Sequence, residues 1–231
     1  MESASLAIVI VIGVGSLGAF ALVIAPALIR CLGRRRHGSH TCPSTGDDGL
    51  ALELQQYPMY VLPIRALLEL RSPMRSHQQL LAEGILVQAT GRELSIVFVS
   101  SERLGAHHPD SRGEQLRALQ STLKRLMVGD TETVMAREDS QDGAVHRISG
   151  AEWERRLRDA YVWVEFMSTP QPGDAGELAH THGSLSESAR ARASVGAYID
   201  RSWLLLVLAP PVVGSDGVCR GFASWLEQGW R

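Results

Sequence analysis

The chain has 231 residues, a formal net charge of −2, 45% hydrophobic residues and 21% charged residues. The near-neutral charge excludes an overall electrostatic attraction to nucleic acid, so no nucleic-acid partner is expected. The apolar fraction excludes an intrinsically disordered chain. Three widely separated cysteines, Cys31, Cys42 and Cys219, are an odd number and do not form a disulfide framework, which favours a reducing compartment for the soluble part.

A long apolar segment follows a five-residue N-terminus, residues 1–5. Residues 6–29 read LAIVIVIGVGSLGAFALVIAPALI, with no charge and with Ser16 as the one polar side chain. About 20 apolar residues in a helix are needed to cross the hydrocarbon core of a bilayer. The sequence therefore predicts a single transmembrane helix over residues 6–29, with the lipid bilayer as a partner.

Positive charges follow this segment, while an acid, Glu2, precedes it. The four arginines of this juxtamembrane collar are Arg30, Arg34, Arg35 and Arg36. Cytoplasmic flanks of membrane helices are enriched in arginine and lysine, so the N-terminus is expected outside and the following domain in the cytoplasm. The collar is also expected to contact anionic headgroups at the membrane interface. A cleaved signal peptide, the main alternative, would carry its positive charges before the apolar run.

Three glycines in the apolar segment match the letters of the dinucleotide-binding fingerprint. Gly13, Gly15 and Gly18 form G-x-G-x-x-G after a strand-like run. That fingerprint needs an amphipathic helix next and an acidic residue at the end of a second strand. Here the next residues are uniformly apolar, and the region of the second strand reads RRRHGSHTCPSTG. We therefore expect no nucleotide cofactor, and interpret the glycines as residues for helix packing.

Residues 30–49 are rich in Gly, Ser, Arg, His, Pro and Asp, a composition that predicts a basic collar and a flexible linker. Cys31, His37, His40 and Cys42 are of the types that bind zinc. Their spacing, C-x5-H-x2-H-x-C, matches no standard zinc site, so no metal is expected here.

The soluble domain, residues 50–231, begins with a predicted helical region over 59–83 that breaks near Ser72 and Pro73. Two β-rich runs, 85–90 and 93–100, flank a Gly91-Arg92 turn and predict a first hairpin. Residues 111–127 place their leucines on one stripe and predict a helix, with Asp110 or Ser111 as the cap.

The second half of the domain predicts further strands and helices. Residues 132–138 and 144–148 flank DSQDG and predict a second hairpin, and 150–159 predict a helix with Trp153 and Leu157 inward. We expect a strand over 161–168, a long loop over 169–186 and a helix over 187–199. The run 203–209 ends at two prolines and predicts a buried central strand, and a short C-terminal helix follows.

These elements predict an α+β fold: a small mixed α/β globular domain with two hairpins, behind one transmembrane helix. The order helix, hairpin, helix, hairpin is similar to that of small sensor and adaptor domains of the profilin-like or roadblock type. This similarity concerns element order alone and implies no activity.

Individual residues were considered as catalytic or metal-binding candidates. Glu165 lies among Trp163, Val164, Phe166 and Met167, and would be a candidate acid if it were buried. The pairs His107/His108 and His180/His182 are interpreted as loop histidines. No motif for a serine nucleophile, a P-loop or a zinc protease occurs, and we assign no catalytic, cofactor-binding or metal-binding residue.

The predicted function is that of an accessory, scaffold or assembly component of a membrane-associated complex, with other membrane-associated proteins as partners. Trp225 and Trp230 near the C-terminus are candidates for an interaction surface. Two alternatives stay open. One is a membrane-tethered sensor or adaptor that binds a small ligand or partner, which requires an apolar pocket with a few converging polar groups. The other is a tethered hydrolase or transferase, which requires clustered His, Glu and Ser side chains.

Overall fold

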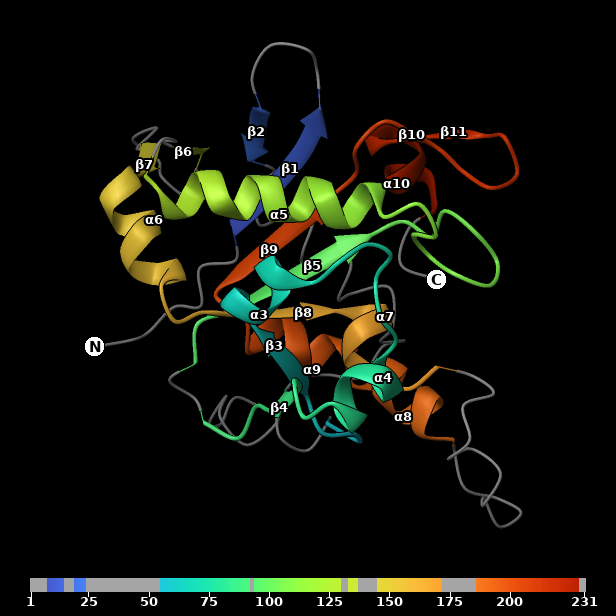
Figure 1. Ribbon diagram of the computed structural model, residues 1–231. Coiled ribbons are helices and arrows are strands. Elements are labelled where there is room, and N and C mark those ends of the chain that lie inside the picture. The colour runs from blue at the N-terminus through green and yellow to red at the C-terminus, as the bar shows by residue number, and fades with distance from the viewer. Residues whose placement is uncertain are drawn as a thin grey trace, which may run out of the picture.

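A twisted β-sheet with helices on both faces forms the centre of the molecule (Figure 1). The structure is a computed structural model and describes residues 8–14, 19–23, 55–91, 94–129, 133–136, 145–171 and 186–228. The order of the sheet is β2-β1-β9-β5-β8-β3-β4. Its strands are β2 (Ala19–Val23), β1 (Ile8–Val14), β9 (Leu204–Leu208), β5 (Ile96–Ser101), β8 (Tyr161–Val164), β3 (Tyr60–Pro63) and β4 (Val87–Gln88).

The strands at the middle of the sheet are parallel and those at its edges are antiparallel. Strands β1, β9, β5 and β8 run in one direction, whereas β2, β3 and β4 each pair antiparallel with their neighbour. Two small two-stranded sheets lie beside it: β6 (Thr133–Ala136) with β7 (Val145–Ile148), and β10 (Val212–Val213) with β11 (Cys219–Arg220). Five strands from β9 to β4 therefore form a mixed sheet, which β1 and β2 extend.

The helices of the described residues cover the two faces of this sheet. They are α3 (Ile64–Glu69), α4 (His77–Ala82), α5 (Glu114–Met127), α6 (Gly150–Leu157), α7 (Glu165–Ser168), α8 (Glu187–Ala193), α9 (Val195–Asp200) and α10 (Phe222–Gln228). Figure 1 shows α5 crossing one face, with α9 behind the sheet.

Alternation along the buried strands divides the core into two layers. On β5, Val97 and Val99 belong to the cluster that packs under α5 and α6, while Phe98 belongs to the other cluster. In that second cluster Phe98 stacks on Trp163 with ring centroids 4.2 Å apart, and Tyr198 of α9 follows. Because successive side chains of a strand point to opposite faces, each strand supplies both layers.

The prediction of a mixed α/β domain is confirmed, with a mixed sheet of five strands from β9 to β4 and the β6–β7 hairpin. Helices cover both faces of the sheet, and β8 continues to β9 through α8 and α9 as a parallel crossover that passes β5. Strand β5 pairs in parallel with both β8 and β9, which are distant in sequence, rather than with the run that precedes it. Parallel strands buried on both faces are continuous apolar runs, as LLLVL of β9 is.

The N-terminal segment also differs from the prediction. Residues 8–14 and 19–23 are strands, not parts of a helix, and β1 pairs with β9 from Ile8↔Leu204 to Ile12↔Leu208. The remaining residues of 6–29 lie outside the described ranges. The run IVIVI is typical of a buried parallel strand and equally of a membrane helix. Hydropathy alone does not distinguish these two structures. No helix in the described ranges is long and apolar enough to cross a membrane.

Three further predictions differ from the structure at β-strands. Residues 85–90 and 93–100 do not form a hairpin, because β4 pairs with β3 while β5 lies between β8 and β9. The region 59–83 begins with strand β3 before α3 and α4, and the strand at 161–168 ends at Val164, where α7 begins. In each case tertiary pairing decided the local conformation.

Several predictions were confirmed. The hairpin at 132–148 is β6 with β7, and the stripe of leucines at 111–127 becomes α5, with Leu116, Leu119, Leu123 and Leu126 buried. Helix α6 buries Trp153 and Leu157 as expected. Every residue of β9 is buried, and a short helix, α10, follows near the C-terminus.

The burial of Tyr198 predicts that the folded domain loses stability at alkaline pH. Its hydroxyl donates to the carbonyl of Tyr57 at 2.9 Å, and burial raises its pKa to about 12. The unfolded chain titrates near pH 10, so stability present below pH 10 is lost as the pH rises towards 12, by about 2–3 kcal/mol. Urea unfolding at pH 7 to 11.5 should show this loss. A Tyr198→Phe variant with an equally steep loss would contradict the assignment.

Candidate functional site

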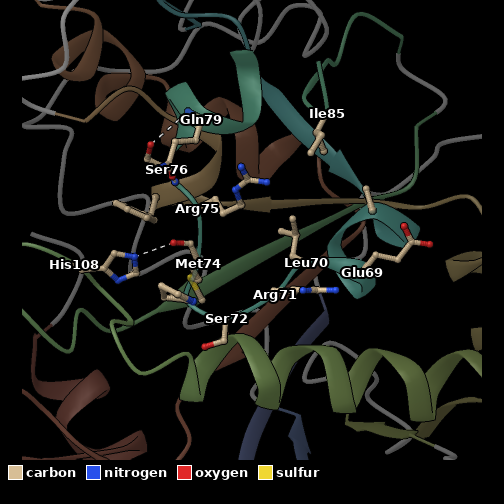
Figure 2. Close-up of a pocket in the computed structure, with 13 residues that line it drawn as sticks. Glu69, Leu70, Arg71, Ser72, Met74, Arg75, Ser76, Gln79, Ile85 and His108 are labelled. Carbon is tan, nitrogen blue, oxygen red and sulfur yellow. Dashed lines mark hydrogen bonds between the residues drawn. The ribbon is translucent and has the colours of Figure 1, made fainter. Parts of the chain in front are cut away.

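The candidate site is a groove between α3, α4 and the loop that follows β5 (Figure 2). Its volume is about 830 Å³, within the range of small-molecule sites. The α3–α4 segment, residues 70–76, forms its floor, and Gln79 of α4, Phe166 of α7 and His108 complete the walls. The wall residues are Ala66, Glu69, Leu70, Arg71, Ser72, Pro73, Met74, Arg75, Ser76, Gln79, Ile85, His108 and Phe166.

Hydrogen bonds from neighbouring elements hold the groove in shape. The side-chain amide of Gln120 on α5 donates to the carbonyls of Leu67 and Leu70, both at 2.9 Å. At α4, Ser76 and Gln79 form a capping box, in which each side chain accepts from the other's backbone N–H. These bonds fix the end of α3 and the start of α4 at the two sides of the groove.

His108 is a structural part of the groove. Its Nδ1 accepts the backbone N–H of Asp110 at 3.0 Å, so in the neutral ring the proton is on Nε2. Nε2 then donates to the carbonyl of Met74 at 2.8 Å. The ring also meets Phe166 edge-on, with centroids 4.8 Å apart. Nε2 therefore fastens the β5–α5 loop to the α3–α4 segment, while Nδ1 holds a turn within the loop itself.

The cationic side chains of the groove differ in their contacts. Arg75 forms an ion pair with Glu83, and both side chains are more than one-third exposed. Arg71 is exposed, and no described residue forms an ion pair or hydrogen bond with its guanidinium. Arg71 is therefore the group in this groove with donor capacity for an anion.

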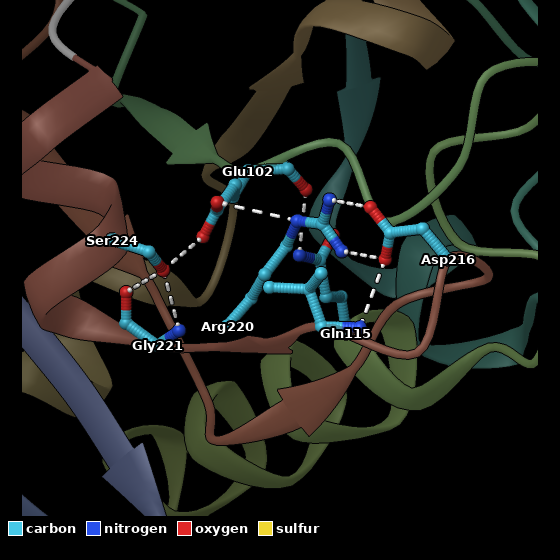
Figure 3. A network of polar contacts seen from close by, with 7 residues as sticks. Glu102, Gln115, Asp216, Arg220, Gly221 and Ser224 are labelled. Atoms are coloured by element: carbon cyan, nitrogen blue, oxygen red, sulfur yellow. Dashed lines mark hydrogen bonds and ion pairs between the residues drawn. The ribbon is translucent and has the colours of Figure 1, made fainter.

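A second polar cluster lies at the carboxyl ends of β5 and β9 (Figure 3). After β5 the chain continues to α5 on one face, and after β9 it continues to α10 on the other. Such a divergence is the usual ligand position of an open α/β sheet. Glu102 lies at this position. Its carboxylate accepts a hydrogen bond from the Ser224 hydroxyl at 2.8 Å and forms an ion pair with Arg220 at 3.4 Å.

Arg220 connects this cluster to the β10–β11 turn. Its guanidinium binds both carboxylate oxygens of Asp216, at 2.7 and 2.5 Å. This contact and the N–H of Val218 lower the pKa of Asp216, and Asp216 raises the pKa of Arg220. Trp225 donates its indole N–H to Ser100 at 3.0 Å. The cluster thus closes the end of the sheet by fastening the C-terminal segment to β5.

The N-terminus of α5 is also occupied from within the chain. The two carboxylate oxygens of buried Asp110 accept the N–H groups of Gln115 and Leu116, at 3.1 and 2.8 Å. This confirms Asp110 as a capping residue. These N–H groups at the start of α5 are therefore satisfied from within the chain.

The residues singled out in the sequence do not meet in one site. Glu165 is exposed at the start of α7, and His107 is exposed on the loop that follows β5. Glu165 was a candidate acid only if it were buried, and it is not buried. Trp225 is buried at 9% exposure and hydrogen bonded, so it belongs to the core, which corrects its assignment to a surface.

The remaining candidates lie outside the described residues. They are the collar arginines Arg30, Arg34, Arg35 and Arg36, the linker residues Cys31, His37, His40 and Cys42, the loop residues His180 and His182, and Trp230. Within the described ranges, no group of three or more His, Cys, Asp or Glu side chains is placed to hold a metal ion. Gly13 lies in β1, and the residues that follow the glycine motif form β2 where a dinucleotide site needs a helix.

Sequence reasoning missed the groove because its residues come from four separate elements. Arg71 and Arg75 resemble ordinary surface arginines in sequence. The sequence indicated the break near Ser72-Pro73, but not the hydrogen bond between His108 and the Met74 carbonyl, 34 positions apart.

Comparisons with known proteins give no relative. No protein-family model, no curated protein and no solved structure matches this chain.

Proposed function

We propose that this protein is an accessory component of a membrane-associated protein complex, with residues 6–29 as its membrane anchor. The observation that carries the proposal is the uncharged run of 24 residues followed by four arginines. This anchor requires residues 8–14 and 19–23 to be a helix in the bilayer, with its backbone hydrogen bonds satisfied internally, in place of the strand pairing of β1 with β9. The domain then lies on the cytoplasmic side.

The core of the domain supports this form. Residues between Tyr57 and Trp225 contact one another in two buried clusters, one on each face of the sheet. The pairs β9–β5, β5–β8 and β8–β3 are made within the same residues. These contacts lie between Tyr57 and Trp225, and the pairing of β1 with β9 adds to them.

Membrane attachment is tested on the full chain by extraction with alkaline carbonate. An anchored protein stays in the membrane pellet, and a reporter fused after Arg231 is active only in the cytoplasm. Release by carbonate would refute the anchor and leave residues 8–14 and 19–23 in the sheet. Purification in mild detergent then tests the accessory role, and recovery of this chain without other proteins would contradict it.

The groove favours a second candidate function, a sensor or adaptor domain that binds a small ligand. Its volume of about 830 Å³ and its mixture of apolar and polar side chains support this proposal. Native mass spectrometry of the purified full chain should find a bound small molecule. Ile85 is half-buried in the groove wall, so Ile85→Trp should fill the groove and abolish this species. A species that survives in Ile85→Trp is bound elsewhere and would exclude the groove.

A further inference from the structure

We infer that the outward face of α5 docks on the anionic surface of a membrane, and so sets which side of the domain lies on the bilayer. This inference rests on the first proposed function and deepens it, because the anchor is what keeps the domain beside a bilayer without choosing its orientation. The cationic face of α5, as we call it, consists of the exposed side chains of Arg117, Lys124 and Arg125.

Helix geometry gathers these three cations on one side of the domain. Figure 1 shows α5 crossing the outside of the sheet, and its leucines at 116, 119, 123 and 126 are buried against the core. The exposed positions 117, 121, 124, 125 and 128 recur every three or four residues, so they share the opposite side of the helix. Arg117 and Arg125 are about 12 Å apart along the helix axis.

No acid of the described residues forms an ion pair with this face. The guanidinium of Arg117 donates to the Ser72 hydroxyl at 3.3 Å and to the Arg112 carbonyl at 2.9 Å, and both acceptors are neutral. The ion pairs within the described ranges do not include Lys124 or Arg125. The three charges are therefore available to an outside partner.

The acids near α5 are too few to cancel these cations. Glu114, in the first turn, is the one acid within the helix, and exposed Arg112 just before the helix offsets it. Asp110 is fully buried where it accepts backbone N–H groups of α5, so it is not part of the surface. The described part of this face thus carries an excess of positive charge, although the whole chain has a net charge of −2.

The helices packed against α5 add no net charge of their own. On α6 and the two residues after it, three arginines stand against three acids, and ion pairs such as Arg156–Glu152 join them. On α3, one exposed arginine is offset by one exposed glutamate. The positive excess on this side of the domain therefore comes from α5 itself.

An anionic lipid surface is the partner that matches such a face on a membrane-tethered domain. Each basic residue held near anionic headgroups strengthens binding about fivefold, so three or four together are enough to orient a domain already held at the bilayer. Val128, at the C-terminal end of the face, exposes 66% of its surface and offers an apolar contact at headgroup level.

The test uses the full chain, with its three cysteines replaced by serine, in vesicles of phosphatidylcholine mixed with phosphatidylserine or of phosphatidylcholine alone. A fluorophore is attached at Ser121→Cys, an exposed position between Arg117 and Arg125. The reference is Gly196→Cys on α9, which packs on the other face of the sheet and where an added Cβ meets no described atom within 4 Å. A lipid with a nitroxide on its headgroup quenches a fluorophore that lies at the bilayer surface.

We expect quenching at position 121 on vesicles with phosphatidylserine and none on phosphatidylcholine alone, while position 196 stays unquenched on both. About 1 M salt should abolish the quenching, because the Debye length falls to about 3 Å. Arg125→Glu should lower the ratio of docked to undocked domain about 25-fold, because it removes one cation and adds one anion.

Arg192→Glu is the matched control. It makes the same charge reversal in the last turn of α8, as Arg125→Glu does in the last turn of α5, and Figure 1 shows α8 at the end of the molecule away from α5. This variant should be quenched at position 121 as the unsubstituted chain is.

Three results would overturn the inference. Equal quenching on neutral vesicles, or equal quenching at positions 121 and 196, would show that charge selects no face. Unchanged quenching in Arg125→Glu, with its fold intact by circular dichroism, would remove the assigned contact. Absence of quenching at 121 in a chain that stays in the membrane after carbonate would leave the face open to an acidic protein, and the anchor would stand. If carbonate releases the chain, the anchor fails, and salt-sensitive quenching at 121 would still identify α5 as the face that binds the bilayer.

Discussion

Replacing Arg220 with methionine is expected to lower the free energy of unfolding by about 3 kcal/mol. The Glu102 carboxylate is 2% exposed, and Arg220 is the cation beside it, at 3.4 Å from Nε to Oε1. Methionine keeps the length of the side chain but leaves a buried negative charge without this guanidinium. Removal of one member of a buried pair costs more than removal of both, because the remaining charge is still desolvated. Urea denaturation at pH 7 measures the loss.

Two further variants test whether the buried charge of Glu102 causes this loss of stability. Glu102→Gln combined with Arg220→Met should recover more than half of the lost stability, because the glutamine still accepts from Ser224 and carries no charge. Asp216→Asn, at the exposed side of the same guanidinium, should cost well under 1 kcal/mol near neutral pH. If the double variant is as unstable as Arg220→Met alone, the buried charge is not the cause.

The contact between Asp216 and Arg220 also predicts how the stability of the domain changes at acidic pH. The folded-state pKa of Asp216 is lowered by Arg220, so its contribution is present above about pH 4 and is lost as the pH falls below that value. Asp216→Asn should therefore reduce the difference in stability between pH 5 and pH 2.

Replacing Gly113 with alanine is expected to destabilise the domain by about 2–4 kcal/mol, from strain in the backbone and from overpacking. Gly113 begins α5 with φ at +68°, and an added Cβ would lie 2.5 Å from the Cβ of Ser72 and closer still to its hydroxyl. The α3–α4 segment would have to move away from α5. Because Ser72 also lines the groove, the Met74 methyl resonance should shift in this variant.

Gly84 provides a matched control for this substitution. Its φ is +67°, nearly the same as that of Gly113, and an added Cβ would meet no atom within 4 Å. Gly84→Ala should therefore cost only the conformational part, about 1 kcal/mol. The difference between the two variants measures the contact of Ser72 with α5. Equal losses would mean that this contact has no energetic role.

The groove could be predicted from the sequence only in fragments. The break at Ser72-Pro73 was recognisable, since proline restricts the residue before it, and Asp110 was recognisable as a cap before α5. The hydrogen bond between His108 and Met74 joins elements 34 positions apart. No local pattern specifies such a contact, so the roles of His108 and Arg71 depend on how α3, α4 and the β5–α5 loop pack together.

By itself the sequence determined the elements whose periodicity is strong. The leucine stripe of α5, the Trp153–Leu157 face of α6, the β6–β7 hairpin and the buried run of β9 each follow from a local pattern. Which strands pair was decided only by the tertiary structure. An all-apolar strand has no polar face to specify its neighbour or direction, so LLLVL and IVFVS do not reveal that they lie side by side in parallel.

The same limit applies to residues 6–29. An uncharged run of 24 residues establishes that this segment avoids water. Whether it satisfies its backbone hydrogen bonds as strands beside β9 or as a helix in a bilayer depends on what surrounds it, because either environment removes the side chains from water. Burial of Trp225 was likewise set by its contact with Ser100 on a distant strand, which its position near the C-terminus did not indicate.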